Sequence, residues 1–185
     1  GNIKQGALDQ INAFPLYSSR TPIDEPLLDD LIPFRIGIMD NDDPRFKTYI
    51  HFRAFLKGLK DNYSADWTSV KYVGRGEEFY RYGGFSREVN FGWTVVAQSR
   101  EELIPMYQKL NYLASACAPD YSKTSGYMRG NLITLTIGDW FNEQVGVMTG
   151  LNISVPDDSP WEISLTEEGR NNEDTGVKQL PHRIE

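Results

Sequence analysis

The chain has 185 residues, of which 39% are hydrophobic and 12% aromatic, a content typical of a globular domain and not of a disordered protein. Its single cysteine, Cys117, excludes a scaffold held by internal disulfides and favours a reducing compartment. The net charge of −7 disfavours free nucleic acid and anionic membranes as partners, and no apolar run approaches the ~20 residues that span a bilayer.

The two ends of the chain differ in composition from its middle. Residues 1–30 are polar and interrupted by Pro15, Pro22 and Pro26, which predicts an extended arm that is ordered by contact with a partner. Residues 31–185 predict one β-rich domain. Its last 30 residues carry a net charge of −5, and His182–Glu185 resembles the start of a strand. We therefore expect a piece of a longer protein that lacks its final strand.

Hydrophobic residues alternate with a period of two in six segments, which predicts β-strands, and 67–73 is a shorter candidate strand. In the clearest segment, 88–97, Val89, Phe91, Trp93 and Val95 lie on one face and polar residues on the other, as in an antiparallel sheet with one buried face. The predicted strands are 32–38, 49–56, 67–73, 88–97, 131–137, 144–155 and 161–165.

One helix is predicted directly after the clearest strand. Ser99 and Glu102 have the spacing of a capping box. Apolar residues then recur at helical spacing, although Pro105 removes one bond and predicts a bend or a late start. The expected buried stripe is Leu103, Tyr107, Leu110, Ala114 and Cys117, with Met106 and Leu113 beside it. Together these elements predict an α+β fold, an antiparallel β-sandwich or open barrel of about seven strands with one main flanking helix.

Residues that commonly carry catalysis are scarce, so we expect no enzyme and no cofactor. Of two histidines, His51 is predicted on the polar face of a strand, in a surface or half-buried position, and Cys117 in the helix core. No set of residues has the spacing of metal ligands, and Asp40–Asp43 lacks the distal Glu of an EF-hand. A hydrolase is disfavoured because no nucleophile–base pair is present.

The glycine-rich stretch 74–84 matches neither a P-loop nor a dinucleotide-binding fingerprint, and it predicts the tip of a hairpin. Arginine and aromatic side chains alternate around it, a mixture that protein interfaces favour, although an ordinary solvated hairpin is an equal alternative. The predicted subunit interface comprises Arg75, Phe79, Tyr80, Arg81, Tyr82, Phe85 and Arg87. We expect residues 72–88 to be mobile in an isolated subunit and ordered after assembly.

Residues 72–163 resemble the tube domain of a known family. The carrying motifs are REVNFGWTVVA at 87–97, SREEL at 99–103, APDY at 118–121, GNLITLTIG at 130–138 and PWE at 160–162. In pattern and order they are similar to the baseplate–tail tube junction proteins, the tail tube initiators of contractile-tailed bacteriophages, which are related to the tail tube protein.

The resemblance implies a structural virion protein that is assembled in the host cytoplasm. Six copies would form a homo-hexameric ring, with neighbouring sheets joined around a channel through which DNA passes without specific binding. The ring would contact baseplate hub and tail tube proteins and template the first ring of the tube. An accessory carbohydrate-binding module of a larger protein is the alternative, with Trp67, Trp140 and Trp161 as platforms on which sugars stack.

Overall fold

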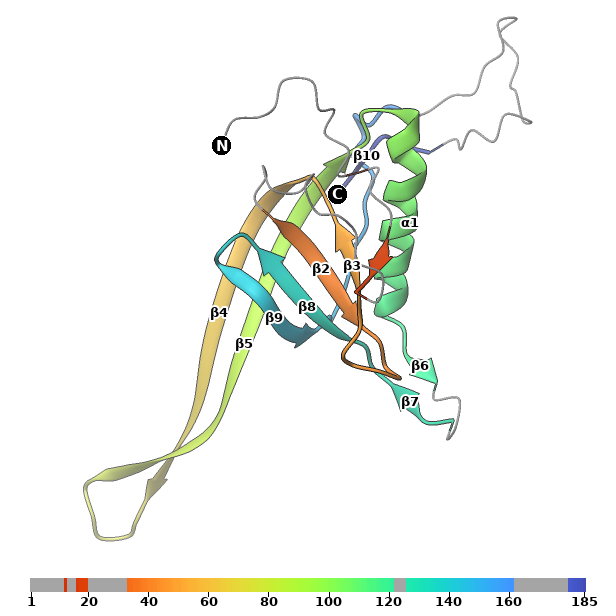
Figure 1. Cartoon of the computed structure of the whole chain (residues 1–185). Coiled ribbons are helices and arrows are strands. Elements are labelled where there is room, and N and C mark those ends of the chain that lie inside the picture. Colours follow the sequence, from red (N-terminus) through yellow and green to blue (C-terminus); the bar gives the residue numbers. More distant parts are fainter. Residues whose placement is uncertain (1–11, 13–15, 20–32, 122–125, 162–179) are drawn as a thin grey trace, which may run out of the picture. The chain divides into compact units, whose positions relative to one another are not determined.

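The computed structural model describes residues 12, 16–19, 33–121, 126–161 and 180–185 of the chain. Within these residues it contains ten β-strands and one α-helix, and every strand pairing that can be assigned is antiparallel (Figure 1). The α+β class predicted from the sequence is therefore confirmed. No helix of the described part is long and apolar enough to cross a membrane.

The chain divides into two compact units, which we describe separately. One comprises Gly1–Ala54 together with Val95–Glu185, and we call it the body. The other is Phe55–Thr94, which we call the hairpin because it consists of one long strand pair.

A five-stranded sheet forms the main part of the body (Figure 1). Its order is β1 (Tyr17–Ser18), β3 (Lys47–His51), β2 (Phe34–Met39), β8 (Leu132–Ile137) and β9 (Phe141–Val147). In the central strand, Ile36 pairs with Ile50 on one side and with Leu135 on the other. Alternate residues of these strands therefore share one face, and Phe34, Ile36, Ile38, Ile50 and Ile137 are buried there.

The helix α1 spans Arg100–Ala116 and begins as the sequence predicts. The Ser99 hydroxyl accepts a hydrogen bond from the backbone N–H of Glu102, and the Glu102 carboxylate accepts one from the N–H of Gln98. The helix is continuous through Pro105, so the expected late start is wrong.

The buried side of α1 differs from the predicted stripe. Cys117 and Ala114 are exposed and Tyr107 is half-buried, so the core position predicted for Cys117 is wrong. The observed stripe keeps Leu103 and Leu110 of the predicted one and includes Met106 and Leu113, which were predicted beside it. The residues buried along the helix are Leu103, Met106, Leu110, Leu113 and Ala116.

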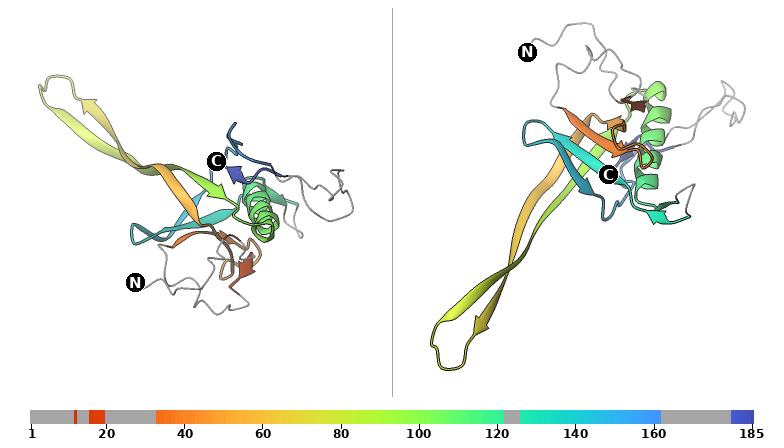
Figure 2. Two further views of the ribbon diagram at one scale, coloured as in Figure 1. Left: turned by 90° about the horizontal axis from the view of Figure 1, so that it is seen from above. Right: turned by 60° about the horizontal axis from the view of Figure 1, so that its bottom comes forward.

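Short strands complete the body. The pair β6 (Asp120–Tyr121) and β7 (Met128–Arg129) follows the C-terminal end of α1, and β10 (Arg183–Ile184) lies beside α1 in both Figure 1 and the left view of Figure 2. The Tyr107 hydroxyl, which donates to the carbonyl oxygen of Pro181, joins the helix to this C-terminal segment.

Several strand boundaries differ from the prediction. The segment 49–56 belongs to two strands, since β3 ends at His51 and β4 begins at Ala54. The segment 144–155 ends as a strand at Val147, while Ser154 exchanges two backbone hydrogen bonds with Glu185 instead. Of 161–165, Trp161 forms an isolated bridge to Pro181, and residues 162–165 lie outside the described residues.

Most of the predicted N-terminal arm also lies outside the described residues. Two parts of it are described, and both contact the body. Tyr17–Ser18 forms β1, a strand that the sequence does not predict, and it pairs with β3. Asn12 is buried.

Candidate assembly interface

The hairpin contains most of β4 (Ala54–Lys71) and β5 (Glu78–Val96), whose terminal residues Ala54, Val95 and Val96 belong to the body. The two strands have 18 and 19 residues and twist around each other (Figures 1 and 2). Both strands are free of proline, which would remove a donor from the ladder. They are much longer than the predicted segments 67–73 and 88–97. The predicted loop 74–84 is wrong beyond residue 77, because Gly83 and Gly84 lie within β5 and the turn uses Gly74, whose φ is 86°.

Aromatic side chains meet across the two strands. Trp67 contacts Tyr82 edge to face with ring centroids 5.0 Å apart, and the ring centroids of Tyr63 and Phe85 are 6.2 Å apart. Near the turn, Lys71 forms an ion pair with Glu78 at 2.7 Å. Such cross-strand pairs are the units that stabilise a sheet, so the hairpin is held by side chains as well as by its backbone.

Three polar side chains form a compact cluster in the middle of the hairpin. Arg87 Nε and Nη2 donate to the two carboxylate oxygens of Asp61 over 2.9 and 2.7 Å. The Tyr63 hydroxyl donates to the same carboxylate over 2.8 Å, and the Arg87 guanidinium lies 4.9 Å from the Tyr63 ring centre. The Asp61 side chain is only 7% exposed, on an element whose residues are otherwise mostly exposed.

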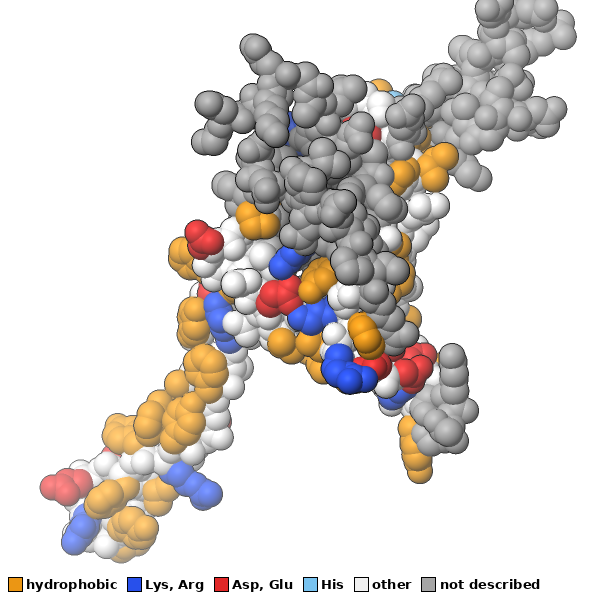
Figure 3. All heavy atoms as spheres, viewed as in Figure 1, with side chains coloured by type: hydrophobic (Ala, Val, Ile, Leu, Met, Phe, Trp, Pro, Cys, Tyr) orange, Lys and Arg blue, Asp and Glu red, His pale blue; other side chains and the backbone are white. Residues whose placement is uncertain are grey.

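Hydrophobic side chains cover much of the hairpin surface in Figure 3. Those of the hairpin that are exposed in the subunit are Phe55, Leu56, Leu59, Tyr63, Trp67, Val70, Tyr72, Val73, Phe79, Tyr80, Tyr82 and Phe85. A monomer rarely exposes so much contiguous apolar surface, and such patches commonly mark interfaces. The six basic and five acidic residues of the hairpin nearly cancel, so its net charge does not oppose close packing.

The hairpin also has two long sheet edges. The sheet order is β10, β5, β4, and β10 pairs with β5 only at Val95 and Val96. In the described part of the chain, no strand is assigned beside the outer side of β4, and the pairing of β5 with β10 is short. Unpaired edges of this length are templates for another chain.

The structure brings the predicted interface residues onto this one element. Arg75 lies in the turn, and Phe79, Tyr80, Arg81, Tyr82, Phe85 and Arg87 lie on β5. Arg87 differs from the others because it contacts Asp61 of its own hairpin. Asp61 and Tyr63 were not indicated by the sequence patterns, because both lie on β4 before the predicted strand 67–73. Only a prediction of longer strands, with residues of β4 paired against residues of β5, could have placed them opposite Arg87.

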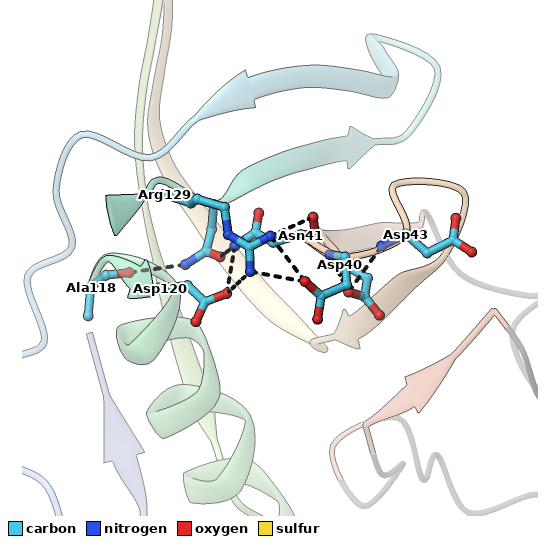
Figure 4. Close-up of polar contacts among 8 residues, drawn as sticks. Asp40, Asn41, Asp43, Ala118, Asp120 and Arg129 are labelled. Atoms are coloured by element: carbon cyan, nitrogen blue, oxygen red, sulfur yellow. Dashed lines mark hydrogen bonds and ion pairs between the residues drawn. The ribbon is translucent and has the colours of Figure 1, made fainter. Parts of the chain in front are cut away.

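Two polar clusters of the body are filled by protein groups. In the first, Arg129 contacts Asp42 and Asp120, and Asn41 donates to Asp120 and Asn131 (Figure 4). The hydrogen bond from Asn41 and the charge of Arg129 lower the pKa of Asp120. Asn131 in turn donates to the carbonyl oxygen of Ala116, one of the terminal carbonyls of α1, and to that of Ala118.

In the second cluster, Glu143 contacts Arg35 and Lys47. Burial alone would raise the pKa of Glu143, but the hydrogen bond from Lys47 and the two positive charges hold it below its ordinary value. The backbone of Glu143 has φ at 51°, which is uncommon for a residue with a side chain.

The acidic turn 40–43 offers no open metal site. Asp40 accepts hydrogen bonds from the backbone N–H groups of Asp42 and Asp43, Asp42 binds Arg129, and Asp43 binds Arg45. The described part of the chain contains no group of three potential metal ligands.

Two buried titratable residues lie between α1 and β3. Lys109 is 1% exposed and donates to the carbonyl oxygens of Asn12 and His51, both at 3.0 Å. Burial lowers the pKa of Lys109 to about 7, although Glu102 opposes the shift. His51 is buried, so its predicted surface or half-buried position is wrong. Burial together with Arg35 and Lys109 lowers its pKa to about 4. The burial of Lys109 and His51 and the hydrogen bonds of Lys109 indicate that both residues have a structural role.

Comparison of the chain with protein-family models, with curated proteins and with solved structures finds no match.

Proposed function

We propose that the chain is a structural subunit that assembles through its hairpin. In this proposal six copies form the homo-hexameric ring that joins the baseplate of a contractile phage tail to the tail tube. The subunit has no catalytic role; it contacts baseplate hub and tail tube proteins in the virion, and DNA passes through the channel without specific binding. The family resemblance is the basis for proposing a hexameric ring, and the exposed hairpin is the proposed contact between subunits.

The carrying observation is the exposure of the hairpin. Trp67, Tyr82 and Phe85 are exposed on strands that have unpaired edges within the described residues. In a closed ring, each edge pairs with a neighbour and each apolar face is covered. Enclosure in an assembly accounts for both features at once, whereas a solvated hairpin accounts for neither.

The charge of the chain agrees with a channel for DNA. A wall that must let DNA slide should not bind phosphates, because every neutralised phosphate strengthens binding. The net charge of −7, with a hairpin close to neutral, suits such a wall.

The test measures particle mass by analytical ultracentrifugation, with negative-stain images of the same samples. We expect rings to form as concentration rises towards about 1 mM, where an association of only ~4 kcal/mol is half complete. Trp67→Ser should prevent ring formation. Trp140→Ser, which changes an exposed tryptophan of the body, should not.

Two results would contradict the proposal. The chain could stay monomeric at every concentration, both alone and with purified tail tube protein. Alternatively, Trp67→Ser could assemble as well as the unchanged protein, which would place the interface elsewhere.

The carbohydrate-binding alternative keeps one supporting observation, since Trp67, Trp140 and Trp161 are all exposed. Exposed aromatic rings offer flat faces for stacking. A glycan array decides this point: binding that is lost in Trp140→Ser or Trp161→Ser would favour the module over the ring.

A further inference from the structure

We infer that Asp61, Tyr63 and Arg87 form a clamp that fixes the hairpin in one conformation before any partner binds. The hairpin would then be a preformed binding element and not a segment that becomes ordered on assembly. This inference depends on the proposed function only for what the hairpin binds, because the clamp itself acts within one subunit.

The cluster contains more hydrogen bonds, in a better geometry, than an ordinary surface ion pair. Exposed pairs contribute little because water screens them and because two flexible side chains must be held in place. Here the guanidinium binds both carboxylate oxygens of Asp61 in a fork, and the Tyr63 hydroxyl supplies a third bond. Bidentate and charge-assisted hydrogen bonds are the strong class in proteins.

The neighbours of the cluster limit the access of water. The side chain of Asp61 is 7% exposed and that of Arg87 is 26% exposed. The Tyr63 ring lies against the guanidinium, and Phe85 lies next to Tyr63. The pKa of Tyr63 is raised, mainly because its hydroxyl donates to Asp61. The Asp61 carboxylate is thus little exposed, and Arg87 and Tyr63, which bind it, belong to the hairpin.

A clamp at this place has a mechanical consequence. An isolated two-stranded hairpin is marginal in water, and one of this length should open from its tip. Asp61 lies on β4 and Arg87 on β5, 26 positions apart in sequence, so their bond joins the strands midway along the hairpin. Opening beyond this point leaves the clamp intact, and opening through it requires both hydrogen bonds from Arg87 to Asp61 to break.

A preformed hairpin also changes the expected mode of assembly. A segment that folds on binding loses conformational entropy at that moment, which lowers its affinity for a given area. A rigid element has lost this entropy beforehand, and it binds with little change of backbone. The glycine-rich stretch alone predicts mobility, whereas the clamp predicts order in the free subunit.

The experiment is hydrogen exchange on the full chain at a concentration where it is monomeric. The readout is the exchange rate of the hairpin amides that bond across β4 and β5. Asp61→Asn should speed their exchange about tenfold, because the charge-assisted bonds are lost. Asp66→Asn, a matched change of an exposed aspartate on the same strand, should leave the rates unchanged.

A second pair of variants tests whether Asp61 and Arg87 act as one unit. Arg87→Met should match Asp61→Asn in effect, and the double variant should be no faster than either single variant. Arg81→Met is the control, since Arg81 is an exposed arginine of the same strand. The thermal melting of the body, followed by its near-ultraviolet signal, verifies that each variant is folded.

The clamp is refuted if the cross-strand amides of the unchanged monomer exchange as freely as an open chain, or if Asp61→Asn and Asp66→Asn behave alike. Neither result depends on ring formation. Faster exchange in Asp61→Asn without any assembly would contradict the proposed function and leave the clamp standing, so the two failures are distinguishable.

Discussion

Lys109 of α1 donates a hydrogen bond over 3.0 Å to the carbonyl oxygen of His51, the last residue of β3. The same ammonium group donates to the carbonyl oxygen of Asn12, whose side-chain amide bonds to Val96 and Arg53. One buried lysine and one buried asparagine thereby connect the helix, two strand ends and the N-terminal segment. Because this junction is buried, its charge makes stability depend on pH.

The first prediction concerns Lys109→Met. The folded pKa of Lys109 is about 7 and its unfolded value about 10.5, so the unfolded chain holds more protons between these values. The contribution of this group to stability is complete above pH 10.5, declines as pH falls towards 7, and is constant below. The free energy of unfolding should therefore rise with pH in this window more steeply than in Lys109→Met, by at most about 1.4 kcal/mol per pH unit.

Denaturant unfolding of both proteins at several pH values from 7 to 10.5 measures this difference. Comparing the two chains removes the contribution of other groups that titrate in the window, such as the tyrosines. Parallel curves would mean that Lys109 is as well solvated in the folded protein as in the unfolded one.

The second prediction separates the buried and exposed sides of α1. Leu110→Ala should lower the free energy of unfolding by roughly 2–5 kcal/mol, because the side chain is 4% exposed and its loss leaves a cavity. Ser99→Ala should cost about 1 kcal/mol through the lost cap.

Ile104→Ala is the matched control on the same helix, since Ile104 is 42% exposed. It should be close to neutral in the same denaturant melts. Equal costs for Leu110→Ala and Ile104→Ala would show that the helix is rotated from the orientation described.

The third prediction concerns a close approach between β2 and β8. A Cβ atom on Gly37 would lie 2.4 Å from the Thr134 hydroxyl, which is too close for any contact, and 3.2 Å from the Tyr49 ring, which is tight. Gly37→Ala should destabilise the protein by about 1–3 kcal/mol, as overpacking of a core does. Adding Thr134→Ala should recover part of this loss, because it removes the nearest atom.

Gly146→Ala in β9 serves as the control, since a Cβ there meets no atom within 4 Å. Thermal melts of the three variants and the unchanged protein give the comparison. If the double variant is no more stable than Gly37→Ala, Thr134 is not the source of the clash.

The fourth prediction concerns Cys117. The thiol is exposed at the C-terminal cap of α1 and does not lie in the core. A maleimide or aromatic disulfide reagent should therefore modify the folded protein as completely as the protein in denaturant, on the same timescale. Modification that requires denaturant would return Cys117 to the buried side of the helix.

Local patterns in the sequence were sufficient for the α+β class, for β2 and β8, and for the start of α1. The boundaries of the hairpin were not predictable in the same way, because several glycines offer a turn and only the backbone geometry selects Gly74 over Gly83 and Gly84. Lysine is among the least buried residue types, so no local pattern placed Lys109 in the core. Asp61 and Arg87 meet only because β4 and β5 are long enough to bring them together.

The hairpin leaves the body after Ala54 and returns at Val95, through strands that are neighbours in one sheet. Matched residues added to or removed from both strands would change its reach by about 3.4 Å for each facing pair and leave every residue of the body in place. Steps of two facing pairs would also preserve which side chains lie on which face. The length of the hairpin can thus be changed, by evolution or by an engineer, independently of the rest of the subunit.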